Sequence, residues 1–280
     1  MTTINTNVSS ITAQAALRNS RASTEKAMER LSTGLKINRG GDDAAGLAIS
    51  SRMTSQIRGL TTAVKNANDG ISLASVADGA LGEVENMLQR IRELAIQSLN
   101  DTNSTEDRGY LDSEVTQLAA EIDRIANTTN FNGKNLFNTA AGLTLKIKAG
   151  ASAGNSAEDI SIELKSMDTD DLGDATTDIA DASVATVADA GKALSSVDAA
   201  IKQVVEQRSD LGAVSNRLEH TVSNLTNVVT NTEMSRSRIQ DADYAVETSN
   251  MTRGQILQQA GTAMLAQANK MSQSVLALLQ

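Results

Sequence analysis

The sequence holds few side chains that could carry out chemistry, and its single histidine is the clearest candidate. His220 has no second histidine with which to bind zinc, and no nucleophile motif accompanies it as a partner for acid–base catalysis. The chain also has no cysteine, which excludes disulfides and thiolate metal sites. The residues therefore indicate neither an enzyme nor a metal or cofactor site, and we interpret His220 as a surface residue of a helix.

Two short loops match ligand-binding motifs only in part. Residues 41–46 have the glycine spacing of a phosphate-binding loop, but Leu47 and Ala48 stand where that motif needs lysine and then serine or threonine. Residues 168–173 hint at a calcium loop, but Leu172 occupies a ligand position and no glutamate closes the loop. We interpret the first loop as a turn that caps a helix beginning near Asp43, and the second as a solvated run of charge.

The elements that must position any functional residue are predicted to be long helices. None of the 280 residues is proline and only 1% are aromatic, so uninterrupted helices are permitted and a deep globular core is not expected. Apolar residues recur at alternating spacings of three and four in the blocks 74–95, 111–125 and 197–229. Three such helices would bury their apolar stripes against one another.

A β-hairpin interrupts this helical pattern. Residues 143–148 and 160–165 each alternate apolar with polar or charged side chains, and a Gly-, Ala- and Ser-rich loop joins them. The sequence therefore predicts one small hairpin near 143–165. Asn132 and Gly133 form a separate turn signal.

Both ends of the chain predict amphipathic helices with narrow apolar stripes that face one another. The N-terminal stripe contains Ile4, Val8 and Ile11, followed by Ala15 and Ala22, and the C-terminal stripe contains Leu257, Met264, Met271, Val275 and Leu278, with Gly261 and Ala268 between them. Burial of a few such side chains does not offset the entropy lost on ordering a helix. We therefore expect a mainly α fold, a long antiparallel helical bundle or coiled coil whose N- and C-terminal helices pair and become ordered on assembly.

The net charge of −9 is concentrated in one short stretch. Residues 158–189 contain ten acidic residues and one lysine, so the remainder of the chain is neutral. We expect residues 168–189 to form a solvated loop or weak helix, and a short linker should be able to replace residues 169–189. Nucleic acid binding would need a clustered basic face, which the scattered arginines do not provide. No apolar run approaches the roughly 20 residues of a membrane span, and the first ten residues do not resemble a secretory signal.

Several ordered motifs resemble those of the bacterial flagellin family. Residues 31–38 (LSTGLKIN), 42–46 (DDAAG) and Arg52 are similar to its N-terminal signature, and 88–95 (LQRIRELA) and 131–133 (FNG) to its middle. Residues 237–245 (SRIQDADYA) and 263–269 (AMLAQAN) are similar to its C-terminal signature. The resemblance covers roughly 1–166 and 190–280, and only residues 167–189 stand where larger relatives carry a variable outer domain.

The resemblance implies a domain plan and a function. It implies a terminal coiled-coil domain of residues 1–42 and 236–280 that forms the inner filament layer, a helical-bundle domain of 43–166 and 190–235, and a short acidic variable segment, 167–189. It implies a secreted subunit, exported unfolded by a type III route, that polymerises with itself into the extracellular flagellar filament for swimming. The partners it implies are an export chaperone at the C-terminal helix, the filament cap, hook-junction proteins and the innate receptor Toll-like receptor 5.

The same resemblance assigns a receptor contact to the helical middle. It implies that Arg90 is the central contact and that Gln89, Leu94 and Glu114 surround it; the alternative is that Arg90 is only a solvated helix residue. Two other functions stay open from the sequence. A hook–filament junction protein shares the terminal design, and a cytoplasmic chemoreceptor-like signalling coiled coil shares the heptads, although it would lack the hairpin strands.

Overall fold

The fold is mainly helical and divides into two compact units. The computed structural model describes residues 6–138, 142–150, 158–174 and 177–277, with their side chains up to residue 270 except those of residues 174 and 177. Residues 1–57 and 230–280 make up the terminal unit, and residues 58–229 make up the middle unit. The division lies inside two long helices, α2 (Ala44–Ser98) and α4 (Val187–Gln240), each of which contributes to both units.

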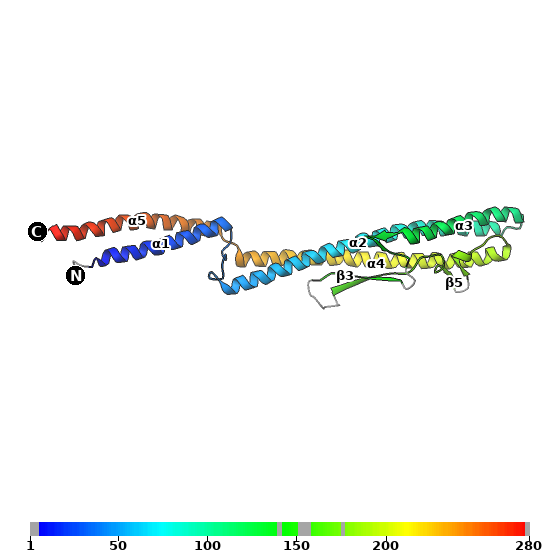
Figure 1. The fold of residues 1–280 in the computed structure, drawn as a ribbon, viewed down its shortest axis with the longest axis horizontal. Helices are drawn as coiled ribbons and strands as arrows, with labels where there is room; N and C mark the ends of the chain where they lie inside the picture. The colour runs from blue at the N-terminus through cyan, green and yellow to red at the C-terminus, as the bar shows by residue number, and fades with distance from the viewer. Residues whose placement is uncertain (1–5, 139–141, 151–157, 175–176, 278–280) are drawn as a thin grey trace. The chain divides into compact units, whose positions relative to one another are not determined.

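The terminal unit pairs the two ends of the chain. α1 (Val8–Thr33) and α5 (Tyr244–Ala277) run antiparallel, and Asn7 lies beside Ala268 at one end of the pair while Arg30 lies beside Glu247 at the other (Figure 1). This confirms the predicted pairing of terminal helices. α1 begins with Asn7, whose side chain accepts a hydrogen bond from the Ser10 N–H, and it ends at a left-handed Gly34.

The middle unit is an antiparallel bundle of α2, α3 (Thr105–Thr128) and α4. A short loop reverses the chain between α2 and α3, and Ser104 and Asp107 form a capping box at the start of α3. Most of the predicted heptad positions pack in one core, which includes Leu81, Leu88 and Ile91 from α2, Val115 and Ile122 from α3, and Val197, Val204 and Leu218 from α4. Leu225 and Val229, at the end of the third predicted block, pack in a second and smaller cluster with Leu60 of α2. The three predicted amphipathic helices are therefore confirmed.

The predicted hairpin is present and packs on this bundle. β3 (Leu143–Lys148) pairs antiparallel with β4 (Asp159–Leu164), and the register sets Leu145 opposite Ile162. Because alternate residues of a strand point to one face, the apolar residues of both strands join the core. A second, very short pair, β1 (Asn130–Phe131) with β2 (Lys134–Asn135), encloses the predicted turn, in which Asn132 and Gly133 both have positive φ.

The acidic segment does not form the solvated loop expected from its charge. It contains the short pair β5 (Gly173–Asp174) and β6 (Thr177–Asp178), followed by a single 3₁₀ turn at Ile179–Asp181. Four apolar residues of this segment are buried in the core of the middle unit: Met167, Leu172, Ile179 and Val184. The aspartates at 170, 171, 178 and 181 remain exposed. The prediction from sequence was wrong because the apolar residues of this segment have no regular spacing, and its many aspartates are typical of a solvated stretch.

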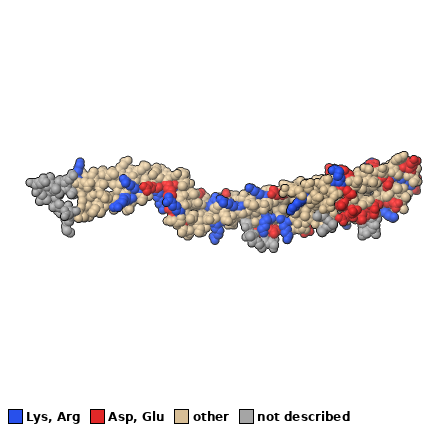
Figure 2. Space-filling model, viewed as in Figure 1, with Lys and Arg blue, Asp and Glu red and all other residues tan. Residues whose placement is uncertain are grey.

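Figure 2 shows the charge that results. Acidic side chains gather over the part of the middle unit that carries β5, whereas the described α1–α5 pair away from the connecting loops is largely uncharged.

Candidate functional site

Small residues bring α1 and α5 together along a heptad seam. On α5 the covered positions recur at spacings of three and four and include Gly254, Gly261, Leu265 and Ala268, and on α1 they include Ser10, Leu17 and Thr24. A Cβ added at Gly261 would lie 3.2 Å from the Leu17 side chain, so this glycine allows the two helices to approach closely. Gly254 is also buried against the Thr24 side chain, and its carbonyl accepts a hydrogen bond from the Ser20 hydroxyl.

This seam corrects the expected contact between the terminal stripes. Val8, Ile11, Ala15 and Ala22 are exposed, and with about 100° of helix per residue they lie on the side of α1 opposite Leu17. Leu257 and Met264 are exposed too, because each lies about 60° around the helix from the seam glycine three residues before it. The expectation that these stripes pack against each other within one subunit is therefore wrong for the large residues Val8, Ile11, Leu257 and Met264, whereas Gly261 and Ala268 of the predicted C-terminal stripe do lie on the seam.

The terminal unit therefore leaves large apolar side chains uncovered in different directions. We call four of them the outward apolar set: Val8, Ile11, Leu257 and Met264, of which 58%, 54%, 53% and 64% is exposed. Among the other residues predicted for these stripes, Ile4 and Leu278 lie outside the described residues, as do the side chains of Met271 and Val275.

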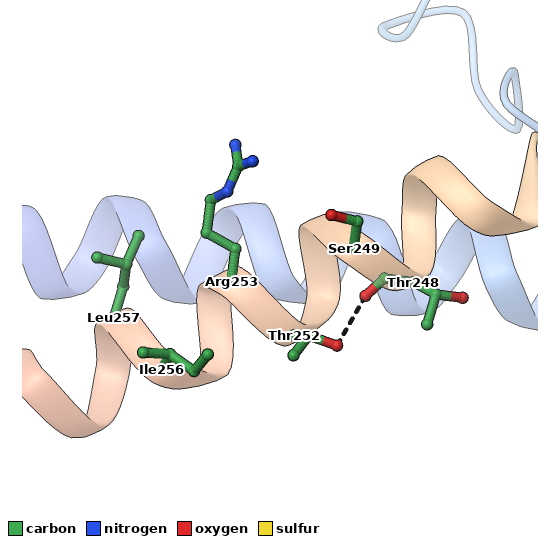
Figure 3. Close-up of a pocket in the computed structure, with 6 residues that line it drawn as sticks. All are labelled: Thr248, Ser249, Thr252, Arg253, Ile256 and Leu257. Atoms are coloured by element: carbon green, nitrogen blue, oxygen red, sulfur yellow. Dashed lines mark hydrogen bonds between the residues drawn. The ribbon is translucent and has the colours of Figure 1, made fainter.

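An open hollow lies on α5 next to Leu257. Its lining comes from one helix alone: Thr248, Ser249, Thr252, Arg253, Ile256 and Leu257. In Figure 3, Leu257 and Arg253 project from one side of the helix, while Ile256 and Thr252 project from another, and the Thr252 hydroxyl donates back to the Thr248 carbonyl at 2.9 Å. The hollow has no enclosing wall, so it lacks the concave shape of a small-ligand site.

The loops that join the terminal helices to α2 and α4 are tied to each other. The Lys36 N–H donates to the Gln240 carbonyl at 2.7 Å, and the Ala242 N–H donates to the Gly34 carbonyl at 2.9 Å. Asp42 accepts from the N–H groups of Asn38 and Arg39 and forms an ion pair with Lys26. The hydrogen bond from Lys26, followed by that from the Asn38 backbone, lowers the pKa of Asp42 to about 2.

The loop at residues 41–46 caps a helix, as the sequence predicts. The Asp43 carboxylate accepts from the Gly46 N–H at 2.9 Å, just where α2 begins. Among the residues that the structure describes, no three acidic, histidine or cysteine side chains are placed to hold a metal ion. None of the described helices contains a stretch long and apolar enough to cross a membrane.

Arg90 lies at the centre of a charged cluster on the middle unit. Its Nε donates to Glu114 of α3 at 2.9 Å, and its Nη1 donates to Glu93, one turn further along α2, at 3.0 Å. The hydrogen bond to Glu114, and to a smaller extent the one to Glu93, raises the pKa of Arg90. Gln89 is exposed beside it, and sequence reasoning had not identified Glu93, which lies at the favourable i, i+3 spacing.

Leu94 does not belong to this surface. Only 1% of it is exposed, because it packs in the core of the middle unit. The implied role of Leu94 as a direct receptor contact is therefore corrected: of the four residues, Gln89, Arg90 and Glu114 are accessible.

Comparison with known proteins agrees with this architecture. Residues 4–141 match the family described as the bacterial flagellin N-terminal helical region, and residues 194–279 match the bacterial flagellin C-terminal helical region. A flagellin of Halalkalibacterium halodurans is 48% identical over 256 residues, which cover 91% of this chain and 92% of that protein. The flagellar filament 33 kDa core protein of Treponema phagedenis is 45% identical over 290 residues, 99% of each chain.

One solved structure shares the fold without close sequence similarity. It is a Vibrio parahaemolyticus protein described as flagellar hook-associated, with a TM-score of 0.58 over 71% of this chain and 100% of that chain, and the identity is 13%. This likeness concerns the fold alone, whereas the similarity to flagellins extends over nearly the whole sequence and favours a filament subunit over a junction protein or a chemoreceptor. The chain therefore belongs to the bacterial flagellin family and is a structural subunit of the flagellar filament, not an enzyme.

Proposed function

We propose that polymerisation of this flagellin buries the outward apolar set of the terminal unit against neighbouring subunits. The observation that carries the proposal is that these side chains remain more than half exposed although the two terminal helices are already paired. Val8 and Ile11 face away from α5, and Leu257 lies on a flank of α5. A subunit with apolar residues on several sides can contact neighbours in more than one direction, as a helical filament requires.

The expected energy of these contacts is modest for each side chain. Full burial of a Val, Leu, Ile or Met side chain contributes about 1.5–3 kcal/mol, so the half that is still exposed contributes about 1 kcal/mol. The four residues together would stabilise assembly by roughly 4 kcal/mol per subunit. We extend the proposal along the same stripes to Ile4, Met271, Val275 and Leu278, on the heptad spacing of the sequence.

Replacing Leu257 with aspartate tests this proposal. A carboxylate carried into an apolar contact costs several kcal/mol, so seeded polymerisation should fail. Thermal unfolding of the monomer should be unchanged, since Leu257 lies outside the α1–α5 seam. Gln259→Asp is the matched control: it adds the same charge at an exposed polar position of the same helix and should still polymerise. Normal sedimentation of filaments by Leu257→Asp would refute the proposal.

We further propose that the subunit reaches the filament unfolded through a narrow export channel. The chain supports this route because it lacks both cysteine and proline, so it can neither be cross-linked nor be slowed by prolyl isomerisation. An export chaperone would cover the exposed residues Ile256 and Leu257 of α5 until export. Loss of chaperone capture in an Ile256→Asp variant, measured with purified proteins, tests that contact. The filament cap and hook-junction proteins are the partners proposed at the two ends of the filament.

We propose that Arg90 is the central contact for Toll-like receptor 5, with Gln89 and Glu114 beside it. Glu93 and Glu114 hold the guanidinium in place, which lowers the entropy lost on binding. Arg90→Ala should reduce receptor signalling at least about tenfold, or ~1.4 kcal/mol. Arg92→Ala is the control, because Arg92 lies two residues along α2 and is paired with Asp198 instead. Equal signalling by the two variants would disprove the assignment.

A further inference from the structure

We infer that Met264 is an oxidation site through which two-electron oxidants, such as hydrogen peroxide, block assembly of the free subunit. The inference rests on the proposed role of the outward apolar set in polymerisation. It concerns a covalent modification of the chain before it enters the filament, and it gives one residue of that set a chemical sensitivity that the other three lack.

The amino-acid composition makes methionine the main target of such oxidants. The chain has no cysteine and no tryptophan, but it has nine methionines. Without a thiolate, the thioether sulfur of methionine is the side-chain group that peroxide oxidises most readily. Seven of the nine lie in the terminal unit, and only Met87 and Met167 lie in the middle unit.

Exposure then separates the methionines. Met264 is 64% exposed, more than any other methionine among the described side chains. Met28 and Met234 follow at 49% and 47%. Met264 lies one heptad beyond Leu257 on α5, with the exposed Ala260 between them. The most accessible thioether is thus part of the surface that we propose as a subunit contact.

The reaction changes Met264 from an apolar to a polar residue. The sulfur lone pair attacks one peroxide oxygen and an S=O bond forms. The O–O bond breaks, and the other oxygen leaves as water after proton transfer. The sulfur loses two electrons and the peroxide gains them. The product is a sulfoxide, whose oxygen accepts hydrogen bonds.

The surroundings of Met264 on α5 make this oxygen costly to bury. Long side chains of a helix lean toward the preceding turn, where Ala260 and Gly261 have no side-chain donor. Gln267, on the following turn, carries an amide, so its removal is one of the controls below. Without a hydrogen-bond partner at a subunit contact, the sulfoxide oxygen costs about 1–3 kcal/mol.

The consequence differs between free and assembled protein. In the free subunit the Met264 side chain is accessible, so peroxide should prevent the subunit from joining a filament. In a filament the proposed contact covers the sulfur and should protect it. The block is reversible in principle, since methionine sulfoxide is a substrate for methionine sulfoxide reductases.

The experiment compares purified monomers before and after hydrogen peroxide, with oxidation mapped by mass spectrometry and assembly followed by sedimentation after seeding. Oxidised wild-type monomer should assemble at least about tenfold more slowly, and its circular dichroism melt should be unchanged. Because Met271 belongs to the same proposed contact, every variant of this series is made in a Met271→Leu background, which should itself assemble and stay sensitive to peroxide. In that background Met264→Leu should assemble before and after peroxide, whereas Met28→Leu, Met234→Leu and Gln267→Ala should stay as sensitive as the wild type. Met264→Gln, which places a polar group there without oxidation, should fail to assemble.

Each outcome decides the inference. Loss of assembly by oxidised Met264→Leu, or normal assembly by oxidised wild type whose Met264 is shown to be sulfoxide, overturns it. Equal oxidation of Met264 in monomers and in filaments also overturns it. The proposed function is tested separately by Leu257→Asp, which needs no oxidant: if that variant fails to assemble while oxidised wild type assembles, the oxidation site is wrong and the contact surface stands.

Discussion

Replacing Leu172 with alanine should destabilise the middle unit by about 3 kcal/mol, although this residue lies within the most acidic stretch of the chain. Leu172 is 1% exposed and belongs to the same core as Leu81, Leu88 and Ile122. Its N–H donates to the Asp168 carbonyl at 3.0 Å, and its own carbonyl accepts from the Ile179 N–H at 2.9 Å. The backbone is therefore held in place, and the truncated side chain would leave a cavity.

The magnitude follows from this burial. Leu→Ala changes at fully buried sites cost about 2–5 kcal/mol, and the cost rises when the surroundings cannot collapse. For a domain of this size, 1 kcal/mol shifts the melting temperature by about 2–4 °C. The transition of the middle unit should therefore fall by roughly 6–12 °C.

Differential scanning calorimetry of the full chain measures this shift, and the adjacent residue provides the control. Asp171 is exposed, so Asp171→Ala should change stability by no more than about 0.5 kcal/mol. Equal melting temperatures for the Leu172→Ala variant and the wild type would show that the segment is not part of the core. In that case a short linker could replace residues 169–189 without loss of stability, as the sequence predicts. The structure predicts that such a linker unfolds the middle unit.

Two further predictions concern pH and helix approach. A hydrogen bond to Asp123 raises the pKa of Asp168 from 3.8 to about 6, so the folded protein keeps a proton that the unfolded chain has already released. Stability should therefore decrease as the pH rises from about 4 to 6, and Asp168→Asn, which keeps a donor to Asp123 at every pH, should flatten that slope in urea titrations. Gly254→Ala should force the Thr24 side chain aside and loosen the α1–α5 pair, measured as faster hydrogen exchange in both helices. Gly212→Ala, where a Cβ meets nothing within 4 Å, should leave exchange unchanged.

Much of the fold followed from local pattern. The heptads of α2, α3 and α4, the alternation of β3 and β4, and the turn at Asn132 and Gly133 each depend on neighbouring residues, and the structure confirms them. The helix cap at Asp43 was predictable for the same reason. In each case the signal is a short-range period or a turn preference that tertiary contacts do not have to supply.

Tertiary packing decided which face of each helix is buried. The sequence placed Val8 and Ile11 against the C-terminal helix because they are the largest apolar residues in their heptad, but close approach at Gly254 and Gly261 favours the small residues instead. Leu94 looked like part of a surface motif, and the core of the middle unit encloses it.

The acidic segment shows the same limit most plainly. Charge and irregular spacing indicated a solvated loop, and the local sequence holds no periodic signal for the burial of Leu172 and Ile179. Their burial depends on core residues that lie far away in the chain, and these residues come together only when α2, α3 and α4 pack. The sequence of this protein therefore determines its helices and turns through interactions between neighbouring residues. Which face of a helix stays exposed to other subunits depends instead on how closely the packed helices approach each other.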